Sequence, residues 1–324
     1  MCSSDLLVAS VGVLALLWAD AGADRVRAAI AGLDPRWVAL ACLVQAGGLL
    51  LRATRVWAAL DGGAPWGLVA RGALTANLGH LVVPSRVADL AGSVWIARQA
   101  GIPVERGIAA YATAAFLEAV AYASILALTL ITAAPVLEGV LTGAQRRDAL
   151  GGLTILTLAG VAVVAVFLRL LPKRDAPPQV GLQERLRRAA GQARGVLTRP
   201  GPLLANLALG AGQIVVMLTV FRCGLEAVGI ELAAPWLGGA LTMAGGAFGG
   251  MVLPPHMGAN TSAAATAVLV PFGATAPQAL TFGGVLWFAA MAPDVLLGLV
   301  GLWLGGGAMW RGDRSPEAGV RSPE

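Results

Sequence analysis

Residues 81–89 read LVVPSRVAD, and residues 251–259 read MVLPPHMGA. In each stretch an apolar run ends at a proline, a basic residue or a histidine follows two positions later, and a glycine further on precedes another apolar segment. Proline lacks the backbone N–H and breaks a helix, so each stretch predicts two half-helices separated by a break. The chain uses this arrangement twice, about 170 residues apart.

The composition indicates a membrane protein. Of 324 residues, 57% are hydrophobic and 13% are charged, with a mean hydropathy of +0.75. A soluble globular protein carries about 25% charged residues, so a soluble protein with a large apolar core is excluded. The sequence predicts an all-α polytopic membrane protein with about 6–8 membrane segments. The apolar runs are 6–19, 37–51, 66–84, 104–134, 150–171, 203–221, 236–253, 259–273 and 278–304.

The two breaks lie in two similar segments, approximately 66–134 and 236–304. In both segments an apolar half-helix, a proline break, a glycine-containing turn and a long apolar run follow one another in the same order. An odd number of spans separates equivalent points of the two copies, so the copies are expected to lie in opposite orientations in the membrane. Inverted repeats with broken or re-entrant half-helices are typical of transporters. The alternative is chance similarity between segments rich in Ala and Gly. We expect one membrane domain, 1–310, and a disordered tail, 311–324.

Charge predicts the orientation. The segment 173–200 contains seven Lys and Arg residues against two acids, which equals the formal net charge of +5 of the whole chain. Basic loops face the cytoplasm, so we expect a multi-pass plasma membrane protein with both termini cytoplasmic. The same charge, without stacking aromatics or a known module, does not indicate a nucleic-acid partner. No nucleotide-binding motif or cofactor motif is present.

The first break carries candidate binding residues. Arg86 and Asp89 lie one turn apart after Pro84, and Ser85 is a natural N-cap. The start of this helix would suit an anionic lipid headgroup, because free backbone N–H groups and a positive dipole end meet there. Alternatively, Arg86 and Asp89 form an ion pair and do no more.

The second break carries candidate binding residues that correspond to those at the first. His256 follows two prolines, and Asn260 and Thr261 open the next helix. These side chains either bind the headgroup or only cap the helix. Two histidines beside the breaks, His80 and His256, do not supply enough ligands for a metal site, so we expect no metal.

A polar path is expected between the breaks. Glu118 lies in the middle of the 104–134 run, and an ionisable residue at that depth is a functional candidate. Arg71 is its expected partner. His80 lies beside the first break, and Asp294 follows Pro293 in the last apolar run. The alternative is that these residues form buried pairs that fix the packing of the helices.

The stretch Pro84-Ser-Arg-Val-Ala-Asp89 resembles the Pro-x-Arg-x-Gly-Glu element of the lysylphosphatidylglycerol synthase transmembrane region, a flippase-like membrane family. The stretch PPHMGANTSAA is similar to that family's second element, Pro-Gly-Gly-x-Gly-x-x-Glu-Ala. This sequence departs from the family pattern at three places. Ala88 and Asp89 replace Gly-Glu of the first element, and Thr261 replaces Glu of the second element. Ala115 replaces the family's arginine in the long span. The resemblance implies movement of a lipid or polyprenyl-linked glycolipid between leaflets, without the aminoacyl-transferase domain.

Three functions remain open on this basis. The first is a flippase-like transporter of an anionic membrane lipid, which is not an enzyme and needs no cofactor. The second is a membrane anchor or regulator of an envelope-lipid glycosyltransferase, docked through the basic loop. The third is an intramembrane lipid-modifying enzyme that depends on Glu118 or Asp89.

Overall fold

The chain is helical throughout the part that the structure describes. The computed structural model describes residues 21–80, 85–140, 197–232, 235–252 and 259–304, with isolated positions between 12 and 19, 143 and 162, and 188 and 195. No strand occurs among these residues. The helices are α2 (Ala23–Ala31), α3 (Pro35–Ala59), α4 (Trp66–Gly79), α5 (Ser85–Gln99), α6 (Val104–Val140), α9 (Pro200–Val228), α10 (Pro235–Val252), α11 (Ala259–Leu269) and α12 (Ala276–Leu304).

Within the described ranges, three helices are long and apolar enough to cross a membrane, namely α3, α9 and α12. This confirms the prediction of an all-helical membrane protein. The apolar runs 203–221, 236–253 and 278–304 correspond closely to α9, α10 and α12. The predicted run 150–171 and the basic loop 173–200 lie largely outside the described residues, and the predicted tail 311–324 lies wholly outside them.

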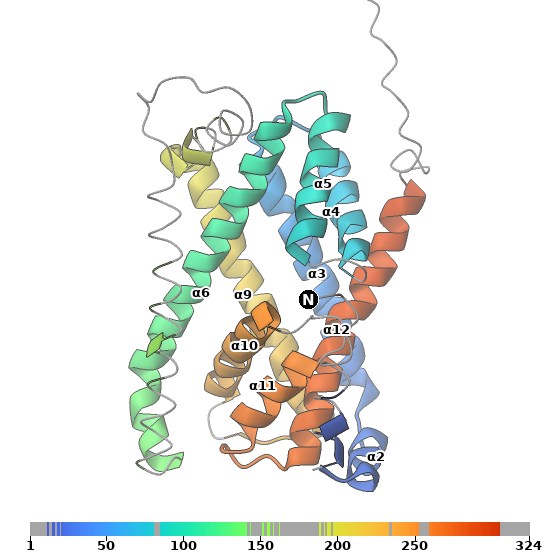
Figure 1. The fold of residues 1–324 in the computed structure, drawn as a ribbon, viewed down its shortest axis with the longest axis vertical. Helices are drawn as coiled ribbons and strands as arrows, with labels where there is room; N and C mark the ends of the chain where they lie inside the picture. Colours follow the sequence, from blue (N-terminus) through green and yellow to red (C-terminus); the bar gives the residue numbers. More distant parts are fainter. Residues whose placement is uncertain are drawn as a thin grey trace, which may run out of the picture.

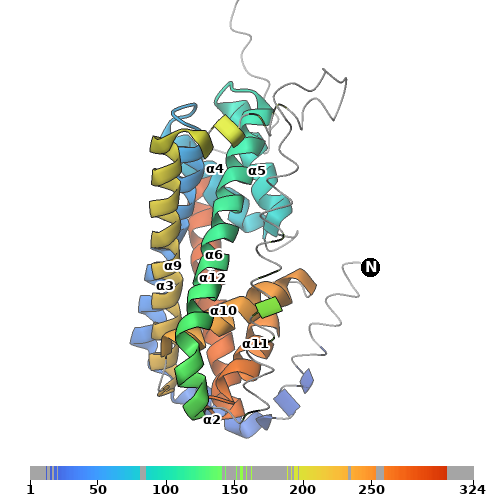
Figure 2. The ribbon, with the colours of Figure 1, turned by 90° about the vertical axis from the view of Figure 1, so that its left-hand side faces the viewer.

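Two long helices, α3 and α9, run side by side along the molecule, and α12 packs against α3, α4 and α11 (Figures 1 and 2). Gly48 permits the close approach of α3 and α9, because a Cβ there would lie 2.7 Å from a methyl carbon of Val216. Small residues at helix contacts are the usual way to pack helices in membranes.

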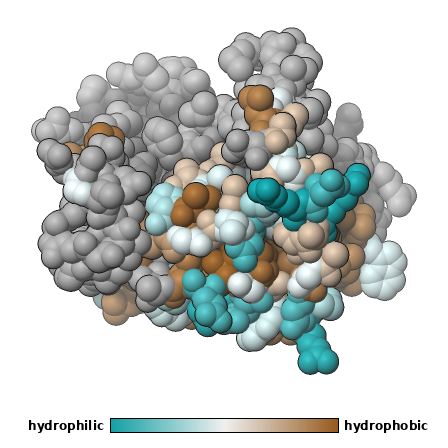
Figure 3. All heavy atoms as spheres, turned by 90° about the horizontal axis from the view of Figure 1, so that it is seen from below, coloured by the Kyte–Doolittle hydropathy of each residue, from teal (hydrophilic) through white to brown (hydrophobic). Residues whose placement is uncertain are grey.

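The two predicted half-helix pairs occupy opposite halves of the molecule. The pair α4 and α5 lies in the upper half, and the pair α10 and α11 lies in the lower half (Figure 1). The breaks themselves, 81–84 and 253–258, lie outside the described residues. Viewed from below, the lower end presents hydrophilic side chains beside apolar ones, as suits a helix-bundle end in contact with water (Figure 3).

The two turns that follow the short helices have the same backbone structure. Gly101 and Gly273 adopt positive φ angles of 66° and 99°. The next residue donates its N–H to the carbonyl five positions earlier, Ile102 to Ala97 at 3.0 Å and Ala274 to Leu269 at 3.1 Å. This is the Schellman C-cap, which favours glycine at the left-handed position. The glycines singled out in the sequence therefore end two equivalent helices.

One predicted boundary is wrong. The predicted apolar run ends at residue 51, whereas α3 continues to Ala59 and includes Arg52 and Arg55. Arg55 is only 2% exposed. A buried guanidinium is tolerated in a membrane helix when acids on neighbouring helices neutralise it, and both arginines have such partners.

Candidate functional site

The carboxylate of Asp89 in α5 is the centre of a buried polar cluster. One oxygen, Oδ2, forms an ion pair with Arg52 of α3 and accepts a hydrogen bond from the Tyr111 hydroxyl of α6 at 3.4 Å. The other oxygen, Oδ1, lies 3.0 Å from Nε2 of His80 at the end of α4. The Asp89 side chain is 8% exposed. Four helices thus converge on one carboxylate.

A fifth helix joins the cluster through Asp294 of α12. Its Oδ2 lies 3.9 Å from Nδ1 of His80, and both side chains are buried, at 10% and 8% exposure. Its Oδ1 is buried without a hydrogen-bond partner among the described residues. The His80 ring therefore lies between two carboxylates, one from each of the two similar segments of the chain.

Local structure explains this placement. His80 is the C-cap residue of α4, next to the predicted break. Glycines on α12 let that helix approach α4 closely: a Cβ on Gly298 would lie 2.5 Å from Cγ of Leu78, and one on Gly301 would lie 2.8 Å from Oγ1 of Thr75. Because α12 lies so close to α4, Asp294 reaches the end of α4.

A small cavity adjoins the cluster. Its volume is about 30 Å³, and Arg52, Asp89 and Tyr111 line it together with Asn77 and Ser93. This volume is enough for one water molecule, and the polar lining could hydrogen-bond it. A water molecule there would touch the ion pair from inside the protein.

A second ion pair lies one turn further along α3. Arg55 donates a hydrogen bond to the carbonyl of Ala114 at 2.6 Å and lies 3.9 Å from Oε2 of Glu118. The expectation that Arg71 pairs with Glu118 is not met. Arg71 instead donates to the carbonyls of Gly67 at 3.3 Å and Leu304 at 3.2 Å, so it caps the end of α12.

The structure brings together three of the residues chosen from the sequence, His80, Asp89 and Asp294. Glu118 lies next to this cluster, because its partner Arg55 lies on the same face of α3 as Arg52. Thr261 lies half-buried in α11. Ser85 begins α5, but the side chains of Ser85, Arg86 and Asn260, and the whole of His256, lie outside the described residues.

Sequence reasoning missed Arg52, Arg55 and Tyr111 as members of these pairs. The available signal was the spacing of Arg52 and Arg55, which follow an apolar run directly at positions i and i+3. That spacing places both guanidinium groups on one helix face, where each needs an acid. Because the predicted run ended at residue 51, this signal was not used.

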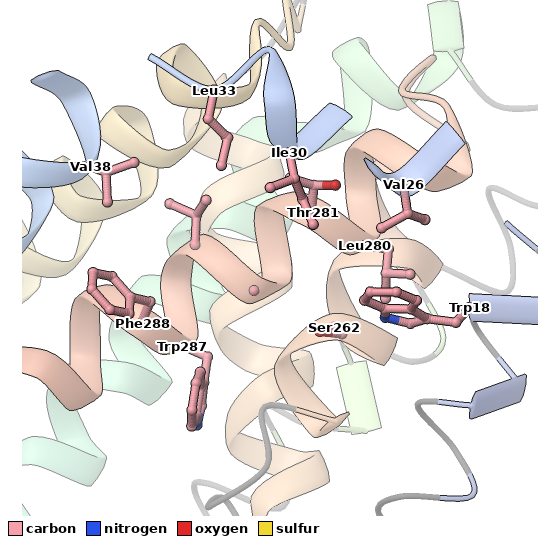
Figure 4. A pocket seen from close by; sticks show the side chains of 12 residues that line it. Trp18, Val26, Ile30, Leu33, Val38, Ser262, Leu280, Thr281, Trp287 and Phe288 are labelled. Atoms are coloured by element: carbon pink, nitrogen blue, oxygen red, sulfur yellow. The ribbon is translucent and has the colours of Figure 1, made fainter. Parts of the chain in front are cut away.

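Two larger cavities lie elsewhere. One of about 300 Å³ between α2, α11 and α12 is almost wholly apolar, with Ser262 and Thr281 as its polar residues (Figure 4). The other, of about 380 Å³, is lined by Asp61, Arg106 and Arg199 near the start of α9. Arg199 forms an ion pair with Asp61, and Arg106 donates to the Leu60 carbonyl at 2.7 Å.

The chain was compared with models of known protein families. The family described as "Lysylphosphatidylglycerol synthase TM region" matches residues 5–298. No curated protein matches the chain.

Proposed function

Because this chain belongs to the family of the lysylphosphatidylglycerol synthase TM region, we propose that it is a flippase-like transporter that moves an anionic lipid between the leaflets of the plasma membrane. The observation that carries the proposal is the buried cluster of Arg52, His80, Asp89 and Asp294 in an otherwise apolar helical protein. Ionisable residues at such depth mark substrate or ion pathways. A polar lipid headgroup needs such a pathway to cross the apolar core.

The arrangement of the helices supports this function. We treat α3–α6 and α9–α12 as inverted repeats, each with one long helix, two short helices and a second long helix. The short pairs occupy opposite halves of the molecule (Figure 1), and their second members end in the same Schellman cap. Transport sites lie near the midplane between such repeats. The cluster joins α4 and α5 to α12 and would therefore lie between the two repeats.

Labelling of introduced cysteines tests the inverted arrangement. In a background without the three native cysteines, Gln99→Cys at the end of α5 should react with a membrane-impermeant maleimide only from the cytoplasmic side. Pro271→Cys, in the turn after α11, should react only from the outside, because the short pairs enter from opposite faces. Both positions are exposed in the protein. Labelling of both from the same side would contradict inversion.

The headgroup assignment predicts the effect of Arg86→Ala. Movement of fluorescent phosphatidylglycerol in proteoliposomes, measured by dithionite quenching, should slow about 10- to 100-fold, because a charge-assisted hydrogen bond contributes about 1.5–3 kcal/mol. Arg98→Ala is the matched control, since Arg98 lies exposed in the last turn of the same helix. If Arg86→Ala moves lipid as fast as Arg98→Ala, Arg86 does not bind the headgroup.

The other two functions make different predictions. A membrane anchor of a glycosyltransferase should lose its complex when the charges of loop 173–200 are scrambled, whereas a transporter should keep moving lipid. An intramembrane enzyme should form a modified lipid, detected by mass spectrometry, in a reaction that Glu118→Gln abolishes. Lipid movement without a product and without a partner supports the transporter.

A further inference from the structure

We propose that the apolar pocket between α2, α11 and α12 binds one acyl chain of a glycerophospholipid, with the ester carbonyl of that chain at Thr281. The pocket is separate from the polar cluster, because Thr281 and Asp294 lie about 20 Å apart along α12. The proposal goes beyond lipid movement, since this site would hold a lipid even in a protein that moves none.

The pocket is apolar inside and open at its rim. Its volume is about 300 Å³. Val26, Leu280 and Val285 form its inner wall, and none of them is more than 5% exposed. Ile30 and Phe288 also line it and are 47% and 49% exposed, so the pocket reaches the surface. An apolar cavity of about 150 Å³ stays dry and binds benzene, so hydrocarbon is the expected occupant of this larger one.

Two adjacent glycines of α12 have different surroundings at the pocket. A Cβ on Gly283 would lie 2.5 Å from Cα of Ser262, so Gly283 lets α11 pack directly on α12. A Cβ on Gly284, which lines the pocket, would meet nothing within 4 Å. The absence of a side chain at position 284 therefore leaves space between α12 and α2.

Thr281 indicates what kind of chain fits. Its side chain lines the pocket, the residue is 6% exposed, and its hydroxyl has no hydrogen-bond partner in the described structure. A buried hydroxyl without a partner is unfavourable, so an acceptor on the occupant would stabilise the complex. The ester carbonyl of an acyl chain is such an acceptor, whereas an isoprenoid chain carries none along its length. The hydroxyl therefore favours an acyl ester.

The order of side chains along the pocket matches that of a phospholipid. Figure 4 shows Val26 and Leu280 at one end of the pocket and Phe288 at the other. At the Val26 end, α2 carries exposed charged side chains, among them Arg25. The Thr281 hydroxyl follows on α12, and apolar side chains continue to Phe288. Charges, a hydroxyl and an apolar wall thus follow one another, as headgroup, ester and chain do in the lipid.

Photocrosslinking in nanodiscs tests the site. The probe is phosphatidylglycerol with a diazirine in the middle of one acyl chain, present in trace amounts in phosphatidylcholine. Cyanogen bromide cleaves after methionine and releases fragment 258–291, which contains the pocket residues of α11 and α12, and fragment 292–309. The second fragment includes the exposed Leu296 and Trp303 and reports contact with bulk lipid. We expect fragment 258–291 to be labelled more strongly than fragment 292–309.

Filling the pocket should remove this excess. Gly284→Leu places a side chain in the open space, so the labelling of 258–291 relative to 292–309 should fall. Gly47→Leu is the matched control, because Gly47 is exposed on α3 and a Cβ there also meets nothing within 4 Å. It should keep the wild-type ratio. If Gly284→Leu keeps that ratio as well, the pocket holds no chain and the proposal is wrong.

Thr281→Val tests the ester contact by a change of similar volume. Labelling of 258–291 by the diacyl probe should fall about 2- to 10-fold, the effect of losing one hydrogen bond. Labelling by a diether probe, which has no ester carbonyl, should be the same in Thr281→Val and in the wild type. If the diacyl probe labels both proteins equally, the ester does not bind at Thr281, and the assignment is overturned.

A competitor distinguishes acyl from isoprenoid chains. Unlabelled polyprenyl phosphate added to the nanodiscs should leave the labelling of fragment 258–291 unchanged. Loss of the labelling would show that the pocket prefers an isoprenoid chain, and the acyl assignment would be wrong. None of these measurements requires lipid to move, so failure of the transport experiment with Arg86→Ala would leave them intact.

Discussion

Replacement of Asp89 by asparagine is expected to destabilise the folded protein by about 3 kcal/mol, measured by thermal unfolding in detergent. The change removes the charge that pairs with Arg52 and faces His80. Removing one partner of a buried ion pair costs about 3–5 kcal/mol, because the other charge stays buried without compensation. We place the effect at the low end of this range, since the Arg52 side chain is 31% exposed.

The matched control is Asp24→Asn, which breaks the ion pair of Asp24 with Arg27. Both of these side chains are largely exposed, at 97% and 78%, so the change should have little effect on unfolding. A second variant, Asp89→Asn with Arg52→Gln, removes both charges and should recover part of the lost stability. If Asp89→Asn unfolds at the same temperature as Asp24→Asn, the buried pair does not stabilise the fold.

Local features of the fold were predictable from the sequence. Gly101 and Gly273 mark two helix ends, and each acts through its own backbone, because glycine accepts a positive φ. The lengths of the apolar runs predicted α9, α10 and α12 closely. Such signals depend only on residues close in the chain.

The pairing inside the site was not predictable to the same degree. Glu118 and Asp294 were recognised because a charge within an apolar run is conspicuous, and Asp89 was recognised because it follows the predicted break one turn after Arg86. Their partners were not, since the period of a helix gives the face of a residue and not the helix that packs against it. Arg71 was the expected partner of Glu118, but with α4 packed against α12 it donates to the Leu304 carbonyl instead.

The site also depends on a contact that polarity patterns do not encode. His80 and Asp294 lie far apart in the sequence and meet because α12 lies close to α4. That approach depends on two glycines, Gly298 and Gly301, in a helix that contains two others. From the sequence alone, nothing distinguishes these two from Gly284, which has open space around it.

This difference between glycines gives the second large expected effect. Gly298→Ala should destabilise the protein by about 1–3 kcal/mol, the usual cost of overpacking a tight contact. The added Cβ would lie 2.5 Å from Cγ of Leu78 and 3.1 Å from the carbonyl oxygen of Leu74, and a backbone carbonyl in α4 cannot move aside cheaply. The helix must shift, so the distance between His80 and Asp294 should increase as well.

Gly284→Ala provides the control on the same helix, because a Cβ there meets nothing within 4 Å. Alanine is the better helix former by about 0.8–1.0 kcal/mol, so this variant should be as stable as the wild type or more stable. Thermal unfolding of the two variants side by side measures the difference. Equal stability of the two variants would show that α12 does not lie against α4 as closely as the structure places it.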